Sequence, residues 1–219
     1  MTMIEAVVFD MDGVLIDSGA HHRAAWQALL EEIGEEPAHP EPWRLTIGRP
    51  SEEAVPLLIN RRLSDYEVRR LARRKRDLYV DFARAGIVTV PGVSRFVADL
   101  AHRRVPRAVG TSASGYDVDH LLAGAGLLSY FDVIVTADDV TYGKPDPEVY
   151  LLAAARLRIA PERCLVFEDS LVGVEAARRA GMRAVGVTTA HTEDELVRAG
   201  AESAVADFEE IEWPTIARP

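Results

Sequence analysis

Cysteine is nearly absent from this chain of 219 residues, in which Cys164 is the only one. A single cysteine excludes a disulfide within the chain, which is typical of proteins that work in a reducing compartment. Cys164 opens the apolar stretch 164–167, so we expect its thiol to lie in the core rather than to react. These features predict a cytoplasmic protein.

Long apolar runs and an excess of positive charge are missing as well. No apolar stretch approaches the roughly 20 residues of a transmembrane helix, and no leader of a basic and then an apolar segment opens the chain. The net charge of −10 at pH 7 disfavours a nucleic acid as a partner. We therefore expect no membrane and no nucleic-acid partner, and nothing in the sequence requires more than a monomer.

Lysine is rare too. Only Lys75 and Lys144 are lysines among the 25 basic residues, and the others are arginines. A compact ammonium and a planar guanidinium bind different partners, so both lysines become candidates for a functional site. Chance is a competing explanation, above all for Lys75.

Hydrophobic periodicity divides the chain into three stretches. Residues 3–10 predict a buried strand, and residues 18–87 predict a block of helices without strands. After Pro91-Gly92 the pattern alternates between strands and amphipathic helices, which indicates an α/β fold with a parallel sheet. The first strand must join that sheet, so the helical block is an insertion placed directly after it.

The expected helices span residues 20–33, 52–61, 64–85, 93–103, 116–125, 147–157 and 171–180, and the expected strands 3–10, 105–110, 131–136, 163–168 and 183–188. Gly34 is a plausible helix stop, because glycine tolerates the left-handed conformation found there. Ser64 and Glu67 have the spacing of a capping box at the start of a helix.

The first strand ends in two carboxylates. The apolar run Val7-Val8-Phe9 leads into Asp10-Met11-Asp12-Gly13, which places Asp10 and Asp12 together at the carboxyl edge of the sheet. Open α/β folds bind ligands at that edge. Neighbouring carboxylates repel one another, so the pair needs a cation, a shared proton or a chemical purpose. A solvated acidic turn is the competing interpretation.

The segment from Asp10 to Ser18 resembles the first motif of the haloacid dehalogenase superfamily, most of whose members are phosphatases with an aspartate nucleophile and magnesium. Three later segments resemble the other motifs in order: Thr111-Ser112, Lys144 between Gly143 and Pro147, and Glu168-Asp169. The resemblance is to the β-phosphoglucomutase-like and sugar-phosphatase branch. It implies a Rossmann-like parallel-sheet core of residues 1–17 and 88–219, with residues 18–87 as a helical cap.

The resemblance also implies the chemistry of the acidic residues. Asp10 attacks phosphorus, while Asp12 protonates the leaving oxygen and then acts as a base on the aspartyl-phosphate. Mg²⁺ is held by the side chain of Asp10, the backbone carbonyl of Asp12 and Asp169. Glu168 is either a further ligand or an outer partner of the metal site. An oxygen-rich pocket with few carboxylates is the kind of site that Mg²⁺ prefers.

The same resemblance assigns Thr111, Ser112 and Lys144 to the phosphate. A hydroxyl at a strand end, followed by free backbone N–H groups, suits an anion. An ordinary helix N-cap is the alternative for Thr111, and a solvated loop residue is the alternative for Lys144.

Two segments of the helical block, residues 20–29 and 74–79, resemble β-phosphoglucomutase. The resemblance implies that His22, Trp26 and Lys75 face the substrate or the catalytic acid. Each has a structural alternative: Trp26 as core of the cap, His22 in a hinge, and Lys75 on a solvated basic helix face.

The loop Gly48-Arg49-Pro50-Ser51 departs from the mutase, which carries an arginine three residues after the glycine to grip a distal phosphate. Ser51 stands at that position, whereas Arg49 follows Gly48 directly and is the other candidate to contact substrate in this loop, together with Gly48 itself. The missing clamp favours a phosphatase acting on a small phosphorylated sugar or polyol. A sugar-phosphate mutase is the alternative, and a non-catalytic binding protein with the same fold is a third.

Overall fold

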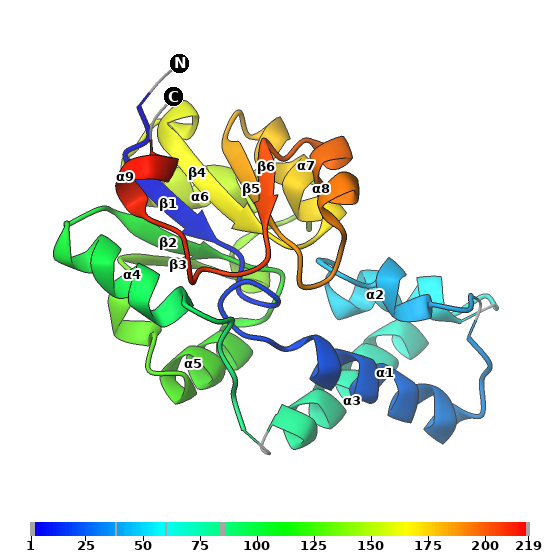
Figure 1. The fold of residues 1–219 in the computed structure, drawn as a ribbon. Helices are drawn as coiled ribbons and strands as arrows, with labels where there is room; N and C mark the ends of the chain where they lie inside the picture. The colour runs from blue at the N-terminus through cyan, green and yellow to red at the C-terminus, as the bar shows by residue number, and fades with distance from the viewer. Residues whose placement is uncertain (1–2, 38, 60, 84–85, 218–219) are drawn as a thin grey trace.

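A parallel sheet forms the centre of the molecule. The computed structural model describes residues 3–37, 39–59, 61–83 and 86–217. Within them the sheet has six strands in the order β3-β2-β1-β4-β5-β6 (Figure 1). The strands are β1 (Ala6–Phe9), β2 (Arg107–Gly110), β3 (Val133–Val135), β4 (Cys164–Glu168), β5 (Arg183–Val187) and β6 (Ser203–Val205).

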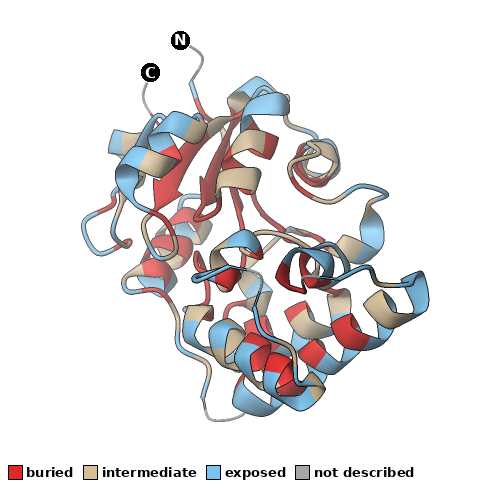
Figure 2. Cartoon of the chain, turned by 90° about the vertical axis from the view of Figure 1, so that its right-hand side faces the viewer, coloured by how far each residue is buried: buried red, intermediate tan, exposed pale blue. Residues whose placement is uncertain are grey.

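Both faces of the sheet are covered, so its central strands are apolar throughout. In β1, Val7 and Phe9 belong to one apolar cluster and Ala6 and Val8 to another. This follows from the alternation of side chains along a strand that is buried on both sides. Figure 2 shows the buried strands between helices whose outer surfaces are exposed.

Each cluster has its own layer of helices. The face of Phe9 is covered by α4 (Val93–His102), α5 (Gly115–Gly124) and α9 (Trp213–Ile216). The face of Val8 is covered by α6 (Glu148–Leu157), α7 (Leu171–Arg179) and α8 (Glu193–Ala199). The predicted α/β fold with a parallel sheet is therefore confirmed.

The block between β1 and α4 is helical, as expected. It holds α1 (Gly19–Ile33), a short 3₁₀ helix (Pro42–Leu45), α2 (Ser51–Leu58) and α3 (Asp65–Ala83). Helices α1 and α2 pack against α3, and the three lie apart from the sheet on the side toward which β1 points (Figure 1).

The predicted ends of these helices are confirmed at two places. Gly34 ends α1 with a φ of 66°, in the left-handed region that glycine occupies without strain. The amide of Ser64 donates to Glu67 Oε2 at 2.9 Å, and the amide of Glu67 donates to Ser64 Oγ at 3.3 Å, which is the expected capping box.

Other element boundaries differ from the prediction. Helix α2 ends at Leu58 rather than at residue 61, because Ile59 is extended and forms an isolated bridge with Pro37. The predicted helix 64–85 begins at Asp65 and is described to Ala83, and residues 84–85 lie outside the described residues. The strands are shorter than predicted by up to three residues at an end.

The structure also adds α8, β6 and α9 beyond the last predicted strand. Strand β6 has only three residues at the edge of the sheet, which is too short for a clear alternation of side chains. Helix α8 does carry a sequence signal that the analysis missed. Thr192 and Glu195 form a capping box at its start, with the amide of Thr192 donating to Glu195 Oε2 at 2.9 Å.

Candidate active site

The carboxyl ends of β1, β2 and β4 meet at one edge of the sheet. Phe9 pairs with Val109 in β2 and with Phe167 in β4, so the residues that follow these pairs are neighbours in space. Within two positions of these pairs stand Asp10, Thr111, Glu168 and Asp169, and all four are buried. The register of the sheet therefore brings the first, second and fourth sequence motifs together.

Lys144 joins this group from the loop before α6 and is 1 % exposed. Its ammonium lies 2.8 Å from Asp10 Oδ1 and 2.7 Å from Glu168 Oε1. Burial lowers the pKa of Lys144, but the two carboxylates outweigh burial and hold it well above the ordinary value. A fixed positive charge thus sits beside Asp10, and the alternative of a solvated loop lysine is excluded.

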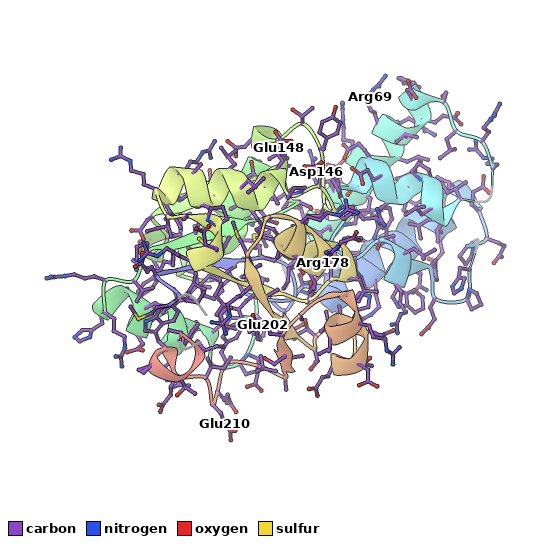
Figure 3. All side chains as sticks on the ribbon, turned by 90° about the horizontal axis from the view of Figure 1, so that it is seen from above. Arg69, Asp146, Glu148, Arg178, Glu202 and Glu210 are labelled. Carbon is purple, nitrogen blue, oxygen red and sulfur yellow. The ribbon has the colours of Figure 1, made fainter. Side chains whose placement is uncertain are left out.

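Glu148 shapes the loop that carries Lys144. Its carboxylate accepts the amides of Thr141 at 2.8 Å and Tyr142 at 2.9 Å, while its own amide donates to Asp146 Oδ1 at 3.0 Å. Figure 3 labels Glu148 and Asp146 at the start of α6. These bonds connect both ends of the loop and so position the lysine.

A cluster of carboxylates lies next to Lys144. One oxygen from each of Asp10, Glu168 and Asp169 lies within 4.8 Å of the others. Burial raises the pKa of Asp10 to about 7, and burial followed by the charge of Glu168 raises that of Asp169 well above its ordinary value. Three buried carboxylates around one lysine lack enough positive charge, so the donor set fits a divalent cation that prefers oxygen.

Glu168 has more partners in the protein than the other two carboxylates. Its Oε1 receives Lys144 and, at 3.1 Å, the hydroxyl of Tyr150. Its Oε2 accepts the amide of Ser170 at 2.7 Å. These contacts favour Glu168 as the residue that orients Lys144, whereas Asp10 and Asp169 are freer to bind a cation.

Gly13 allows the acidic turn to approach Asp169. Its φ is +74°, and a Cβ at this position would lie 2.0 Å from Asp169 Oδ2. The hydroxyl of Thr189, which follows β5, donates to the carbonyl of Gly13 at 2.6 Å. A side chain at residue 13 would therefore push the turn away from the candidate metal ligand.

Thr111 lies at the end of β2 and is 2 % exposed. Its Oγ1 accepts the amide of Ala113 at 3.1 Å. The N-cap of α5 is Ser114, whose side chain accepts the amide of Asp117. Thr111 is therefore not the helix cap that the sequence left open as its alternative.

Asp12 connects the core to the helical block through a chain of hydrogen bonds. His22 Nε2 lies 3.0 Å from Asp12 Oδ1, and Lys75 Nζ lies 2.7 Å from His22 Nδ1. Charged lysine can only donate, so Nδ1 accepts and the proton of the neutral imidazole sits on Nε2, facing Asp12. Lys75 on α3 is thereby linked to Asp12 through α1.

The series of hydrogen bonds from Lys75 through His22 keeps Asp12 in its ionised form. Burial raises the pKa of Asp12, but the hydrogen bond with His22 and the charge of Lys75 lower it by more, to about 2. Burial and the charge of Lys75 together lower the pKa of His22. In this state Asp12 is ready to act as a base.

Aromatic rings enclose Lys75. Its ammonium lies 4.9 Å from the ring centre of Trp26 and 5.1 Å from that of Tyr79, distances at which a cation is attracted to a ring. The ring of Tyr79 also stacks on His22, with ring centres 4.3 Å apart. Lys75 is 5 % exposed, so it does not lie on a solvated helix face.

The loop Gly48-Arg49-Pro50-Ser51 touches the core. The hydroxyl of Ser112 donates to the carbonyl of Gly48 at 2.9 Å. A Cβ on Gly48 would lie 2.2 Å from Ser170 Oγ, so glycine allows this close approach. The sequence predicted that the hydroxyl of Ser112 binds the phosphate. In the structure this hydroxyl instead joins the sheet region to the helical block through Gly48. The guanidinium of Arg49 lies 3.8 Å from Glu53.

The sheet region and the helical block between β1 and α4 together enclose a cavity of about 540 Å³. This volume lies within the range of small-molecule sites. Its lining includes all but one of the residues selected from the sequence, namely Asp10, Asp12, His22, Trp26, Gly48, Arg49, Lys75, Thr111, Ser112, Lys144 and Asp169. The exception is Glu168, which lies behind Lys144. The sequence analysis missed Tyr79, Asp117, Glu148 and Tyr150.

The chain matches known proteins along most of its length. A family model for haloacid dehalogenase-like hydrolases matches residues 7–187. Validoxylamine A 7'-phosphate phosphatase of Streptomyces hygroscopicus subsp. limoneus is 35% identical, across 98% of this chain and 99% of that protein. Fructose-1-phosphate phosphatase YqaB of Escherichia coli is 36% identical, across 83% of this chain and 95% of that protein.

A crystal structure of β-phosphoglucomutase from Clostridium difficile is similar in fold, with a TM-score of 0.85 and 26% identity. The similarity covers 98% of this chain and 96% of the mutase. The fold is thus shared between phosphatases and a mutase, and only the residues of the site can distinguish them.

Proposed function

Because the chain belongs to the haloacid dehalogenase-like hydrolase family, we propose that it hydrolyses the phosphate monoester of a small sugar or polyol through an aspartyl-phosphate on Asp10. One observation carries this proposal: Lys144, 1 % exposed, is fixed 2.8 Å from Asp10 in the wall of a cavity that Asp12 also lines. A nucleophile, a fixed cation and a second carboxylate around one cavity are what phosphoryl transfer requires.

The proposed magnesium site consists of the side chains of Asp10 and Asp169 and the backbone carbonyl of Asp12. The ion would neutralise charge on the phosphate oxygens. Glu168 is an outer partner in this proposal, since Lys144, Tyr150 and Ser170 already occupy its oxygens.

The protein groups then divide the reaction between them. Lys144 offsets the charge of the phosphate, so that Asp10 can approach phosphorus despite repulsion between two anions. In this proposal Thr111, at the end of β2, donates its hydroxyl to a phosphate oxygen.

Asp12 is the acid and base of the proposal. Asp12 is ionised at neutral pH, so its carboxylate is able to accept the proton of the water that cleaves the aspartyl-phosphate. The acid step needs a proton, which arrives with a substrate bound as the phosphate monoanion and passes to the leaving oxygen through Asp12.

The proposal favours hydrolysis over isomerisation because the arginine with which the mutase grips a distal phosphate is replaced by Ser51. Ser51, where the mutase has an arginine, begins α2 and lines the cavity, and Arg49 faces Glu53. The phosphatase relatives named above support the same choice.

The proposal also retains the predicted domain organisation. Residues 18–87 form the cap, and residues 1–17 and 88–219 form the catalytic core. We further propose that the protein is a monomer and that it acts in the cytoplasm on a small phosphorylated metabolite.

A product assay tests the proposal. The protein is incubated with β-glucose 1-phosphate and Mg²⁺, and free phosphate and glucose 6-phosphate are measured over time, with and without β-glucose 1,6-bisphosphate. We expect free phosphate as the main product, no activation by the bisphosphate and loss of activity with EDTA. Glucose 6-phosphate that dominates and depends on the bisphosphate would establish the mutase instead.

A further inference from the structure

Two of the three tryptophans in the chain have a clear place in the packing. Trp26 is buried in the apolar cluster of Phe9, and Trp213 packs against that cluster. Trp43 is only partly buried and belongs to neither apolar cluster of the described residues. Within the same part of the chain, no aromatic ring or cation contacts its indole. Tryptophan is normally well packed, so this position needs a reason.

The position of Trp43 in the cavity supplies a reason. Trp43 lies on the 3₁₀ helix Pro42–Leu45 of the cap and lines the same cavity as Asp10 and Asp12. Ile47, four residues further on, lines the cavity too and is likewise outside both apolar clusters. These two side chains therefore offer apolar surface to a ligand, in a cavity whose catalytic candidates are charged.

The segment that carries Trp43 is held in place from both sides. Arg44, the next residue, donates to Glu195 Oε1 on α8 of the core at 2.6 Å. The amide and the hydroxyl of Thr46 donate to the carbonyl of Trp43 at 3.0 and 2.7 Å. The backbone of Trp43 is thus fixed without a ligand, so little conformational freedom is lost when a ligand packs against the indole.

We propose that Trp43 is a specificity-determining residue that stacks on a ring of the leaving group, so that the substrate is a cyclic sugar monophosphate rather than an open-chain polyol phosphate. The inference rests on the proposed phosphatase function and adds the shape of the leaving group. The C–H groups on one face of a sugar ring form a flat and weakly positive surface, which the negative face of an indole attracts. An open chain lacks such a face and loses more conformational freedom on binding.

Two matched pairs of probes test the shape of the leaving group. Glucose 6-phosphate is compared with sorbitol 6-phosphate, and fructose 1-phosphate with mannitol 1-phosphate. Within a pair the carbon skeleton and the position of the phosphate are the same, and only the first member forms a ring. The kcat/KM of each is measured with Mg²⁺. A probe that is not turned over is measured as a competitive inhibitor of the hydrolysis of acetyl phosphate, which has no ring.

Two variants of Trp43 test the residue. We expect wild type to prefer the ring in at least one pair by about tenfold, the order of one stacking contact. Trp43→Ala should remove this preference by weakening only the ring-shaped member, whereas Trp43→Phe, which keeps a ring face, should retain most of it. Leu45→Ala, at an exposed position of the same 3₁₀ helix, is the matched control and should keep the full preference. The preference is a ratio within one variant, so a smaller folded fraction cannot produce the result.

Other results would overturn the inference. A wild-type protein that binds and hydrolyses ring and open chain equally well, or prefers the open chain, would contradict it, as would a preference that survives in Trp43→Ala. Equal losses on both members of a pair would make Trp43 a structural residue of the cap. A wild-type protein that releases phosphate from none of the probes, acetyl phosphate included, would refute the phosphatase function itself, and only then would the inference fall together with it.

Discussion

The buried lysine on the core side of the cavity is surrounded by carboxylates, whereas the buried lysine on the cap side is surrounded by neutral rings. On the core side Lys144 is held by two carboxylates, and its pKa is raised well above the ordinary value. On the cap side Lys75 contacts an imidazole and two aromatic rings, and its pKa is lowered to about 8. Both lysines are buried, so the difference between their pKa values comes from their partners and not from their exposure to solvent.

The comparison shows how one cavity can separate two tasks. A phosphate carries the same charge in every substrate, so a permanent cation suits the core side. Leaving groups differ in their hydroxyls, so the cap side benefits from weaker and more directional donors and acceptors. Variants on the core side should therefore affect all substrates alike, and variants on the cap side should affect them unequally.

The largest effect is expected from Asp10→Asn. The amide is a poor nucleophile and a weaker ligand for a cation, so turnover of every substrate should fall below a few per cent of wild type. Phosphate release from 4-nitrophenyl phosphate and from a sugar phosphate, together with a circular dichroism spectrum, checks this. Asp119→Asn, at an exposed position of α5, is the control and should be fully active. Substantial activity in Asp10→Asn would refute covalent catalysis through this residue.

Lys144→Ala should follow. Removing one preorganised charge from a reaction site lowers kcat by about 100- to 1,000-fold, on the sugar phosphate and the aryl phosphate alike. It also leaves Asp10 and Glu168 buried without their cation, a change that costs about 3–5 kcal/mol of stability. Kinetics on both substrates and a thermal melt measure the two effects separately. A loss confined to one substrate would contradict the division between core and cap.

Lys75→Ala should show the opposite pattern. We expect KM for the sugar phosphate to rise about 10- to 100-fold, since a charge-assisted contact to the leaving group is worth about 1.5–3 kcal/mol, while 4-nitrophenyl phosphate is little affected. Arg69→Ala is the matched control, because Arg69 lies on the same helix with an exposed side chain (Figure 3). Equal effects on both substrates would mean that Lys75 acts through His22 and Asp12, or through packing of the cap, and not on the leaving group.

The smallest effect is a pH dependence that belongs to Lys75. Burial lowers its pKa from the ordinary 10.5 to about 8, so its charge is lost near pH 8 in the folded protein. KM for the sugar phosphate should therefore rise above pH 8, and this rise should be absent with 4-nitrophenyl phosphate and in Lys75→Met. A pH profile of KM that is identical in wild type and Lys75→Met would contradict the assignment of this pH dependence to Lys75.

The same shift affects stability, with a sign that follows from proton binding. Between pH 8 and 10.5 the unfolded chain keeps this proton and the folded protein does not. The contribution of Lys75 to the free energy of unfolding must then rise with pH in this window. Denaturant titrations of wild type and Lys75→Met at pH 7.5 and pH 10 measure the difference.

The sequence by itself determined the location of the candidate catalytic groups, because their positions depend on local pattern. Apolar strands that are buried on both faces end just before Asp10, Thr111 and Asp169, and parallel strands bring such ends to one edge of the sheet. The rarity of lysine selected Lys144 and Lys75, and both are buried at the site. Resemblance to known motifs supplied the remaining assignments of the core.

Only the tertiary structure decided how these groups share their contacts. Glu168 faces Lys144 rather than open space, Ser112 donates to Gly48, and His22 lies between Asp12 and Lys75. Each of these contacts joins residues far apart in the chain, across elements whose relative placement no local pattern encodes. Among the described residues, Asp117 Oδ1 is buried without a hydrogen-bond partner, and this too depends on everything packed around it.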